Sequence, residues 1–255
     1  MSTTLQLKAN YERIYRETGI VDSPRLYHWI AGLLNAHPGA RVLDVACGEG
    51  RLVYEARQQG LDAIGVDLAE AALQKARRLT GNRFAAANAE QLPFRTGTFD
   101  YVTCLGSLEN MAHPDIALAE LTRAAKDDAL FCLLMPNAFW LGDVVSTATR
   151  GTEDVLFQEF ERRATPQAWR QFLTAHGLVI EREHRYNRPA VLFRNGKLRS
   201  IRKFVSRSLL NLCTPFNLSW SFVFLCRKDR SWRQNGTALG LLWEGRPAGV
   251  SSKVL

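Results

Sequence analysis

The chain has 255 residues, of which 46% are hydrophobic and 23% charged. This composition is typical of a globular protein with a sizeable core and excludes a disordered or fibrous chain. Lys and Arg outnumber Asp and Glu by 33 to 25, and this basic balance favours nucleic acid, anionic lipid or acidic metabolites as partners. The charged first residues and the lack of an apolar run of about 20 residues indicate neither a signal peptide nor a membrane span, so we expect a cytoplasmic protein.

From residue 41, short apolar runs rich in β-branched residues alternate with segments of helical periodicity. The runs predict strands over residues 41–46, 62–67, 83–88, 100–105 and 129–135, and the periodic segments predict helices over 69–79 and 114–125. Because strands alternating with helices form βαβ units around a buried parallel sheet, the sequence predicts an α/β fold.

The pattern changes after residue 136, where a segment too long for a simple strand-to-helix connection begins. Thr165 and Pro166 then predict the N-cap and first position of a helix that ends at Gly177. Two last strands are predicted over residues 178–186 and 219–227. We expect one domain over residues 1–228, with an N-terminal helical cap (1–39), a lid insertion (137–164), a basic amphipathic insertion (187–217), and a tail beyond it (229–255).

A glycine-rich turn follows the first predicted strand, in the stretch Asp44-Val45-Ala46-Cys47-Gly48-Glu49-Gly50. Small residues between a strand and a helix let the backbone approach a ligand closely, and the helix directs its N-terminal amides at that ligand. Asp67 ends the next strand, where an acidic side chain commonly accepts hydrogen bonds from both ribose hydroxyls. Together these features predict a nucleotide-binding site.

The dinucleotide fingerprint requires a third glycine, and Val53 stands at that position. A carboxylate just ahead of the turn, Asp44, serves a pyrophosphate badly but suits a ligand with a cationic end, such as the amino group and sulfonium of S-adenosylmethionine (SAM). A Rossmann-like domain that binds another nucleotide, or none, is the alternative.

Four motifs in order carry a resemblance to a known family: VLDVACGEG, the following VD, ANAEQLPF, and FDYVTCLGSLENM. Over residues 40–135 and the final two strands, the chain resembles the class I SAM-dependent methyltransferases, most of all the branch of ubiquinone-biosynthesis and natural-product enzymes. The resemblance implies a three-layer Rossmann-like fold, in which helices cover both faces of a seven-stranded, mostly parallel sheet with an antiparallel last strand. It also implies SAM as the cofactor.

The resemblance assigns cofactor-binding roles to residues along the predicted crevice. Asp44 helps to hold the methionine end, Asp67 takes the ribose diol, and Leu68 packs on adenine. The other expected contacts are the turn residues Ala46, Gly48 and Gly50, the adenine-reading Asn88 and Ala89, Leu105 and Gly106 beside the transferred methyl group, and Tyr11 as an aromatic cap.

Two positions depart from the family pattern. Ala46 replaces the first glycine of the turn, a change that is tolerable if the residue keeps a negative φ. Asn88 replaces the usual aspartate, and its amide carbonyl can still accept a hydrogen bond from the adenine amino group.

Methyl transfer from a sulfonium requires an acceptor held at attack distance, and a general base helps when that acceptor is a hydroxyl. Glu109 and His113 follow the point where the methyl group should lie, so both are candidate catalytic bases. His113 also precedes Pro114 and is equally explained as the N-cap of a surface helix. Neither a zinc site nor a carboxylate cluster for Mg²⁺ is indicated, and no metal is expected.

The acceptor is less defined than the cofactor. Aromatic residues in the lid insertion favour an apolar or aromatic molecule, small or lipid-linked, with a hydroxyl oxygen as the methyl acceptor. Residues 198–212 form a basic amphipathic pattern, explained either by contact with an anionic membrane or by a helix with one face in the core. The expected location is therefore cytoplasmic, with peripheral membrane contact as one reading of this pattern.

Two other functions stay open. The net charge of +8 makes an RNA methyltransferase a candidate function. The chain lacks the motifs of nucleic-acid methyltransferases, which argues against it. A non-catalytic SAM-binding partner subunit fits the cofactor residues equally well. The sequence does not indicate an oligomeric state.

Overall fold

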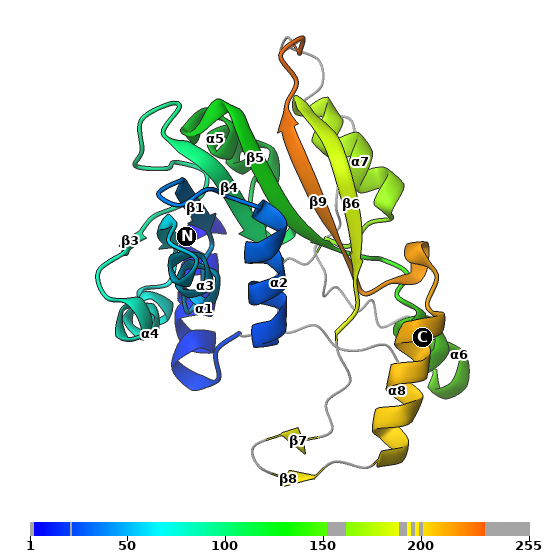
Figure 1. Cartoon of the computed structure of the whole chain (residues 1–255). Helices are drawn as coiled ribbons and strands as arrows, with labels where there is room; N and C mark the ends of the chain where they lie inside the picture. The colour runs from blue at the N-terminus through cyan, green and yellow to red at the C-terminus, as the bar shows by residue number, and fades with distance from the viewer. Residues whose placement is uncertain are drawn as a thin grey trace.

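The computed structural model describes residues 3–20, 22–151, 162–188, 193–194, 197–198 and 201–232 of the chain. Its centre is a seven-stranded sheet in the order β3-β2-β1-β4-β5-β9-β6 (Figure 1). The strands are β1 Arg41–Val45, β2 Asp62–Asp67, β3 Phe84–Ala86, β4 Phe99–Leu105, β5 Ala125–Pro136, β6 Leu178–Tyr186 and β9 Ser221–Lys228.

Only β9 runs against its neighbours in this sheet, pairing antiparallel with both β5 and β6. The other pairs are parallel, so the carboxyl ends of β1, β2 and β4 meet at one edge. The predicted mostly parallel sheet with an antiparallel last strand is confirmed. The largest differences in strand length are at β3, which is shorter than residues 83–88, and at β5, which begins four residues before 129.

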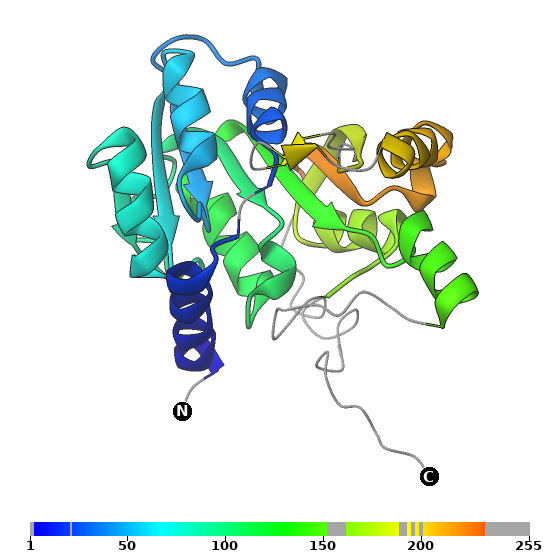
Figure 2. The ribbon, with the colours of Figure 1, turned by 90° about the horizontal axis from the view of Figure 1, so that it is seen from below.

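Helices cover both faces of the sheet and form the outer layers of a three-layer fold (Figures 1 and 2). They are α1 Thr3–Glu17, α2 Pro24–Leu34, α3 Arg51–Gln58, α4 Glu70–Thr80, α5 Pro114–Ala124, α6 Leu141–Arg150, α7 Pro166–Ala175 and α8 Ile201–Cys213. Short 3-10 turns lie at η1 Leu108–Asn110 and η2 Phe216–Leu218, and a small hairpin joins β7 Phe193–Arg194 to β8 Lys197–Leu198. The start of α7 is as predicted, because the Thr165 hydroxyl accepts a hydrogen bond from the Ala168 N–H.

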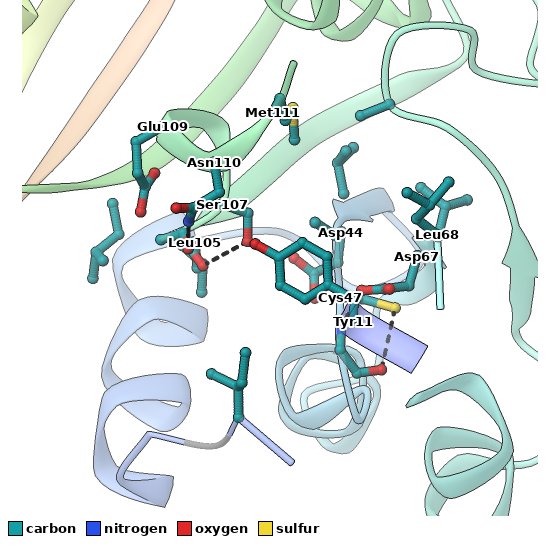
Figure 3. Close-up of a pocket in the computed structure, with 18 of the residues that line it drawn as sticks. Tyr11, Asp44, Cys47, Asp67, Leu68, Leu105, Ser107, Glu109, Asn110 and Met111 are labelled. Carbon is teal, nitrogen blue, oxygen red and sulfur yellow. Dashed lines mark hydrogen bonds between the residues drawn. The ribbon is translucent and has the colours of Figure 1, made fainter. Parts of the chain in front are cut away.

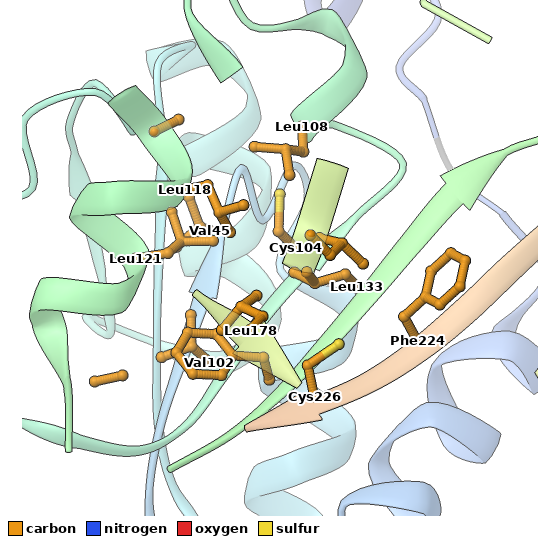
Figure 4. Close-up of a cluster of buried hydrophobic side chains, with 14 of the residues drawn as sticks. Val45, Val102, Cys104, Leu108, Leu118, Leu121, Leu133, Leu178, Phe224 and Cys226 are labelled. Atoms are coloured by element: carbon orange, nitrogen blue, oxygen red, sulfur yellow. The ribbon is translucent and has the colours of Figure 1, made fainter. Parts of the chain in front are cut away.

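The two faces of the sheet pack into two separate cores. Along β5, Phe131 and Leu133 belong to the core shared with α5 and α7, whereas Leu130 and Cys132 belong to the core shared with α2 and α3. Such alternation is what the pleat of a buried strand imposes. Cys104 lies in the first of these cores (Figure 4), as its position within a predicted strand indicates.

The leading helix α1 is fixed to the sheet domain through the start of α4. The Glu12 carboxylate accepts hydrogen bonds from the backbone N–H groups of Glu70 and Ala71, and a carboxylate is favourable at a helix N-terminus. Tyr15 is buried against Ala69 and Ala72. The helix therefore has a defined position beside the carboxyl edge of β2.

The predicted insertions are described only in part. Within 137–164, α6 is described, but residues 152–161 of the expected lid lie outside the described residues, as do residues 233–255 of the expected tail. The helix predicted from residue 198 begins at Ile201, because Leu198 pairs with Phe193 in the small hairpin. None of the helices in the described part of the chain combines the length and apolar character needed to cross a bilayer.

Candidate functional site

A pocket opens at the carboxyl edge of the sheet (Figure 3). Its walls come from the turn after β1, the ends of β2 and β4, the segments that follow β3 and β4, helix α1, and the connection between α1 and α2. Most of the residues predicted to bind the cofactor line it: Asp44, Ala46, Gly48, Asp67, Leu68, Asn88, Ala89, Leu105, Gly106 and Tyr11. Gly50 and His113 are not among the lining residues.

The turn after β1 consists largely of residues with left-handed backbone. Ala46 has a φ of 55°, Gly48 of 52° and Gly50 of 73°. The condition under which the alanine is easily tolerated, a negative φ, is therefore not met. The turn itself imposes the left-handed conformation at this position, and the alanine Cβ is accommodated there with strain.

The two glycines of the turn are needed for different reasons. A Cβ on Gly48 would lie 2.7 Å from the hydroxyl oxygen of Tyr15, so this glycine admits the α1 side chain that forms the pocket wall. A Cβ on Gly50 would lie 2.5 Å from the Phe84 ring. Gly50 therefore supports the packing of the start of α3 against β3, and the structure does not place it in contact with the pocket.

Asp67 is buried at the end of β2, and its carboxylate joins two backbone segments. One oxygen accepts a hydrogen bond from the Gly48 N–H at 2.8 Å, and the other accepts one from the Ala69 N–H at 2.9 Å. Burial raises the pKa of this carboxyl, while the backbone hydrogen bonds oppose that rise. Each carboxylate oxygen has two lone pairs, so further hydrogen bonds from a ligand are available.

Asp44 is also buried and has fewer partners. Its carboxylate accepts one hydrogen bond, from the Thr103 hydroxyl on the neighbouring strand β4 at 2.7 Å. Burial, with a smaller contribution from the nearby Asp67 charge, raises the pKa of Asp44 to about 7, although the hydrogen bond from Thr103 opposes the rise. Neither of the two carboxylates pairs with a described Lys, Arg or His side chain. The pocket is thus suited to a ligand that brings positive charge.

The segment after β3 forms a third side of the pocket, next to Leu68. The Asn88 side-chain oxygen accepts a hydrogen bond from the Glu90 N–H at 3.0 Å. The amide is thereby oriented with one lone pair of its oxygen already used. Ala89 and Leu68 also line the pocket and add apolar surface, as a planar base requires.

The segment after β4 forms the remaining wall, from Leu105 through η1. Gly106 has a φ of 63°, which turns the chain across the pocket. Glu109 and Asn110 are each only 4% exposed although both line the pocket. Figure 3 shows their side chains on the same wall, with the Asn110 amide donating to the Gly106 carbonyl.

Asn110 is a site residue that sequence reasoning missed. Its amide nitrogen is engaged with Gly106, and its buried side-chain oxygen has no hydrogen-bond partner within the described structure. Such an orphaned acceptor calls for a ligand donor. No motif marks the residue, so the only sequence signal is its place next to Glu109.

His113 lies outside this site. It is the N-cap residue of α5, its side chain is exposed, and its backbone N–H donates to Glu90. The alternative prediction, a surface N-cap position, describes it better than the predicted catalytic role does, although its side chain makes no capping hydrogen bond.

Arg162 holds the wall after β4 from outside the pocket. Its guanidinium donates hydrogen bonds to the backbone carbonyls of Glu109, Met111 and Ala112. Three bonds from one rigid planar group fix the conformation of this segment. The orientation of Glu109 and Asn110 thus depends on a residue that precedes α7.

Residues far apart in the chain close the pocket near the ends of β6 and β9. Arg188 stacks on the Trp220 ring at 4.4 Å from its centroid and pairs with Asp22 at 3.3 Å. Asp22 also accepts a hydrogen bond from the Tyr186 hydroxyl at 2.9 Å. Tyr27 adds an aromatic side chain from the start of α2. This wall offers aromatic and apolar surface with its charges already paired.

The sequence of residues 43–133, which contains this turn and the strands on either side of it, matches the family model of the methyltransferase domain. This match identifies a methyltransferase domain over residues 43–133, about a third of the chain. In this domain the turn after β1, the end of β2 and the end of β4 are the segments that build the pocket.

Curated relatives match part of the methyltransferase domain. The chain is 37% identical over 138 residues to a demethylmenaquinone methyltransferase of Renibacterium salmoninarum, a stretch that covers 54% of each chain. It is 36% identical over 107 residues to a ubiquinone biosynthesis O-methyltransferase of Hahella chejuensis, covering 37% of this chain and 42% of that one. A ubiquinone/menaquinone biosynthesis C-methyltransferase of Burkholderia multivorans is 35% identical over 115 residues, covering 42% and 47%. The chain thus spans about half the length of these relatives, or less.

Solved structures share the fold over most of the chain. The magnesium protoporphyrin IX methyltransferase of Synechocystis, solved with bound S-adenosylhomocysteine (SAH), has a TM-score of 0.56 at 19% identity and covers 89% of this chain and 95% of its own. At this identity the likeness shows the fold alone.

The polar and apolar groups that line the pocket fit SAM. Two buried carboxylates that lack cationic partners in the described structure face a ligand with an ammonium, a sulfonium and a ribose diol. Leu68, Asn88 and Ala89 present the apolar and amide groups that an adenine ring can contact. The turn approaches closely because Gly48 carries no Cβ.

Proposed function

We propose that the protein is an enzyme that transfers a methyl group from SAM to a hydroxyl oxygen of a small-molecule or lipid-linked acceptor. The observation that carries the proposal is the continuity of one pocket. It runs from the Asp44 and Asp67 carboxylates, past Leu105 and Gly106, to a second polar group at Glu109 and Asn110. SAM, when bound, supplies an electrophilic methyl group.

On the cofactor side, the residues of the domain bind and orient. Asp67 takes the ribose hydroxyls while its existing bonds keep the turn in place. Asp44 provides negative charge for the cationic end, and the Thr103 hydroxyl holds that carboxylate in one orientation. Tyr11 and Tyr15 line the pocket from α1 and exclude water from it.

On the acceptor side, Glu109 is the group proposed to receive the hydroxyl proton. It is buried, it lines the pocket, and it follows the end of β4 directly. The Asn110 side-chain oxygen accepts a hydrogen bond from the acceptor and fixes its position. Met111, Leu134 and Trp220 supply the apolar surface that an aromatic ring or a prenyl chain would contact.

The names of the relatives support the class of acceptor. They include O- and C-methyltransferases of quinone biosynthesis, whose names point to phenolic and quinone-type molecules. We favour oxygen as the methyl acceptor because a buried carboxylate at the acceptor end is what a neutral hydroxyl requires, whereas an already acidic oxygen or an amine gains less from it.

The test is transfer of a labelled methyl group from SAM to a panel of phenols, each with and without a prenyl chain. Formation of an O-methyl product, identified by mass spectrometry, supports the proposal. A product methylated only on carbon would show that the methyl acceptor is a ring carbon and not a hydroxyl oxygen. Tight SAM binding without any product in the panel or in a cell extract would favour the non-catalytic partner subunit.

The RNA methyltransferase remains a second candidate only because of the basic balance of the chain. Binding to RNA with a steep linear dependence on salt concentration would support it. We also propose that residues 198–212 contact an anionic membrane surface, which would give the protein a peripheral location.

A further inference from the structure

The basic charge of the chain is concentrated in one segment. Residues 184–220 contain eight Lys and Arg and no Asp or Glu, whereas the rest of the chain contains 25 Lys and Arg against 25 Asp and Glu. The excess of positive charge therefore belongs to the segment around α8 and not to the fold as a whole. Such a segment is attracted to anionic surfaces.

Helix α8 turns its more apolar face outward. Ile201, Val205, Leu209 and Leu212 are 62%, 47%, 55% and 74% exposed. The described half-buried residues of the helix are Phe204, Ser208, Leu210 and Asn211, two of which are polar. The alternative prediction of a helix whose apolar face belongs to the core is therefore wrong. We call Ile201, Val205, Leu209 and Leu212 the outer stripe.

The outer stripe is accompanied by positive charge. The 13-residue sequence of α8 contains Arg202, Lys203 and Arg207 and no acidic residue. An exposed apolar stripe on a helix rich in Lys and Arg is the pattern of helices that lie in the interface of an anionic membrane. At about 20 Å in length the helix can lie along a bilayer surface but is too short to cross it.

The rest of the domain places α8 at the end of the molecule where the pocket lies. Figure 1 shows α8 and the β7–β8 hairpin at the lower end of the molecule, beyond the carboxyl ends of the parallel strands. Helix α6 lies on the same side of the molecule as α8 in Figures 1 and 2, although Figure 2 shows the two helices apart. On and just before α6, Phe139, Val144 and Val145 are also exposed.

Contacts within the described residues connect α8 to the pocket wall. The Asn211 amide donates to the Arg188 carbonyl at 2.8 Å, and the Arg188 side chain stacks on Trp220 inside the pocket wall. The Arg185 guanidinium donates to the carbonyl of Thr214, just after α8. A surface bound by α8 would therefore lie at a fixed place relative to the acceptor end of the pocket.

We propose that α8 docks on the surface of an anionic lipid bilayer, with the outer stripe inserted among the lipids and the basic residues of the helix at the headgroups. The helix thereby delivers the pocket mouth to the membrane that holds a lipid-linked acceptor. The docking itself depends only on α8 and does not require the proposed methyl transfer, so either proposal can fail while the other holds.

The test is flotation of the full chain with vesicles of phosphatidylcholine alone and with vesicles that contain phosphatidylglycerol. We expect binding to the anionic vesicles only, weakened by added salt. Substituting Val205→Ser together with Leu209→Ser should lower the partition coefficient about tenfold or more. Arg202→Glu with Lys203→Glu should abolish binding. The control is Val179→Ser. Val179 lies near the start of β6 and is as exposed as Val205, so this variant should float as the wild type does.

SAH affinity is measured on every variant, because it reports whether the domain is folded and whether the cofactor site is intact. Failure of the wild type to float with anionic vesicles would overturn the docking proposal. Equal flotation of the double serine variant and the control would also overturn it. A dimer in sedimentation that the double serine variant converts to a monomer, without vesicle binding by the wild type, would assign the outer stripe to a second copy of the chain.

Discussion

The carboxylate of Asp67 accepts a hydrogen bond from the backbone N–H of Gly48, 19 residues earlier in the chain, at 2.8 Å. This bond joins the end of β2 to the turn after β1, so the ribose-binding group and the turn that surrounds the methionine end are assembled before a ligand arrives. Pre-assembly of this kind lowers the entropy cost of binding. It also means that the backbone of the turn is as important to the site as its side chains.

Substituting Gly50→Ala should destabilise the domain although Gly50 does not line the pocket. The new Cβ would lie 2.5 Å from Phe84, and the backbone has a φ of 73°. We expect the free energy of unfolding to fall by about 2–4 kcal/mol, from strain and overpacking together. Chemical denaturation measures this change.

Gly97→Ala is the control that separates these two causes. Gly97 has a similar φ of 67°, but a Cβ there would meet no atom within 4 Å. We expect it to lose only the strain, about 1–2 kcal/mol. Equal losses in the two variants would show that the contact with Phe84 is unimportant.

Ala46→Gly should stabilise the chain, which is unusual for a substitution by glycine. Relief of the strain at a φ of 55° is worth about 1–2 kcal/mol, and the extra backbone entropy of glycine offsets about 0.5–1 kcal/mol of it. We expect the free energy of unfolding to rise by about 0.5–1 kcal/mol. Ala119→Gly, on the exposed side of α5, should instead lower it by about 1 kcal/mol. A loss in both variants would contradict the left-handed conformation of Ala46.

The turn shows where the sequence is informative and where it is not. The acidic residues at the ends of β1 and β2 were predicted, because the strands and the glycines between them follow a pattern that the ligand imposes. The sign of φ at Ala46 could not be predicted, because it depends on the path of the whole turn and not on the residue type. The exclusion of Gly50 from the pocket depends on Phe84, which no local pattern connects to it.

The stability of the ligand-free protein should depend on the ionisation of Asp44. Burial raises its pKa to about 7, against about 3.9 in an unfolded chain. The folded state therefore binds the proton more tightly, and the stability that this group contributes is full below about pH 4 and is lost as the pH rises through about 7.

Asp44→Asn removes that ionisation and keeps an oxygen that accepts the hydrogen bond from Thr103. We expect the variant to melt at a higher temperature than the wild type at pH 8, and the difference to shrink as the pH falls toward 5. Thermal unfolding without ligand at a series of pH values measures this. A difference that is constant over the whole range would show that Asp44 does not titrate in it.

Glu109→Gln should separate the acceptor chemistry from cofactor binding. If Glu109 receives the hydroxyl proton, kcat with a phenolic acceptor should fall about 100-fold or more, while SAH affinity stays the same. His113→Ala should leave both quantities unchanged, because that side chain is exposed and lies outside the pocket lining. Loss of kcat in His113→Ala and not in Glu109→Gln would reverse the roles of the two residues.

The acceptor side of the site was harder to predict than the cofactor side. Glu109 was predicted from its place after β4, but Asn110 acquires its role only through the bond to Gly106 that leaves its oxygen without a partner. Arg188 follows β6 and Trp220 precedes β9, so the two residues meet at the pocket only through the fold. The pattern of α8 placed Ile201, Val205, Leu209 and Leu212 on one face, but periodicity alone does not say whether the domain covers that face.

The most direct test of the account is calorimetric titration of SAM and SAH into the wild type, Asp67→Ala and the control Asp62→Ala. Asp62 lies on the same strand, but its side chain is half exposed and pairs with Arg83. We expect binding to the wild type and the control, and an affinity at least about tenfold lower in Asp67→Ala, because each hydrogen bond to a charged group contributes about 1.5–3 kcal/mol. No binding of either ligand to the folded wild type, or equal affinities in all three proteins, would contradict the assignment of this pocket to SAM.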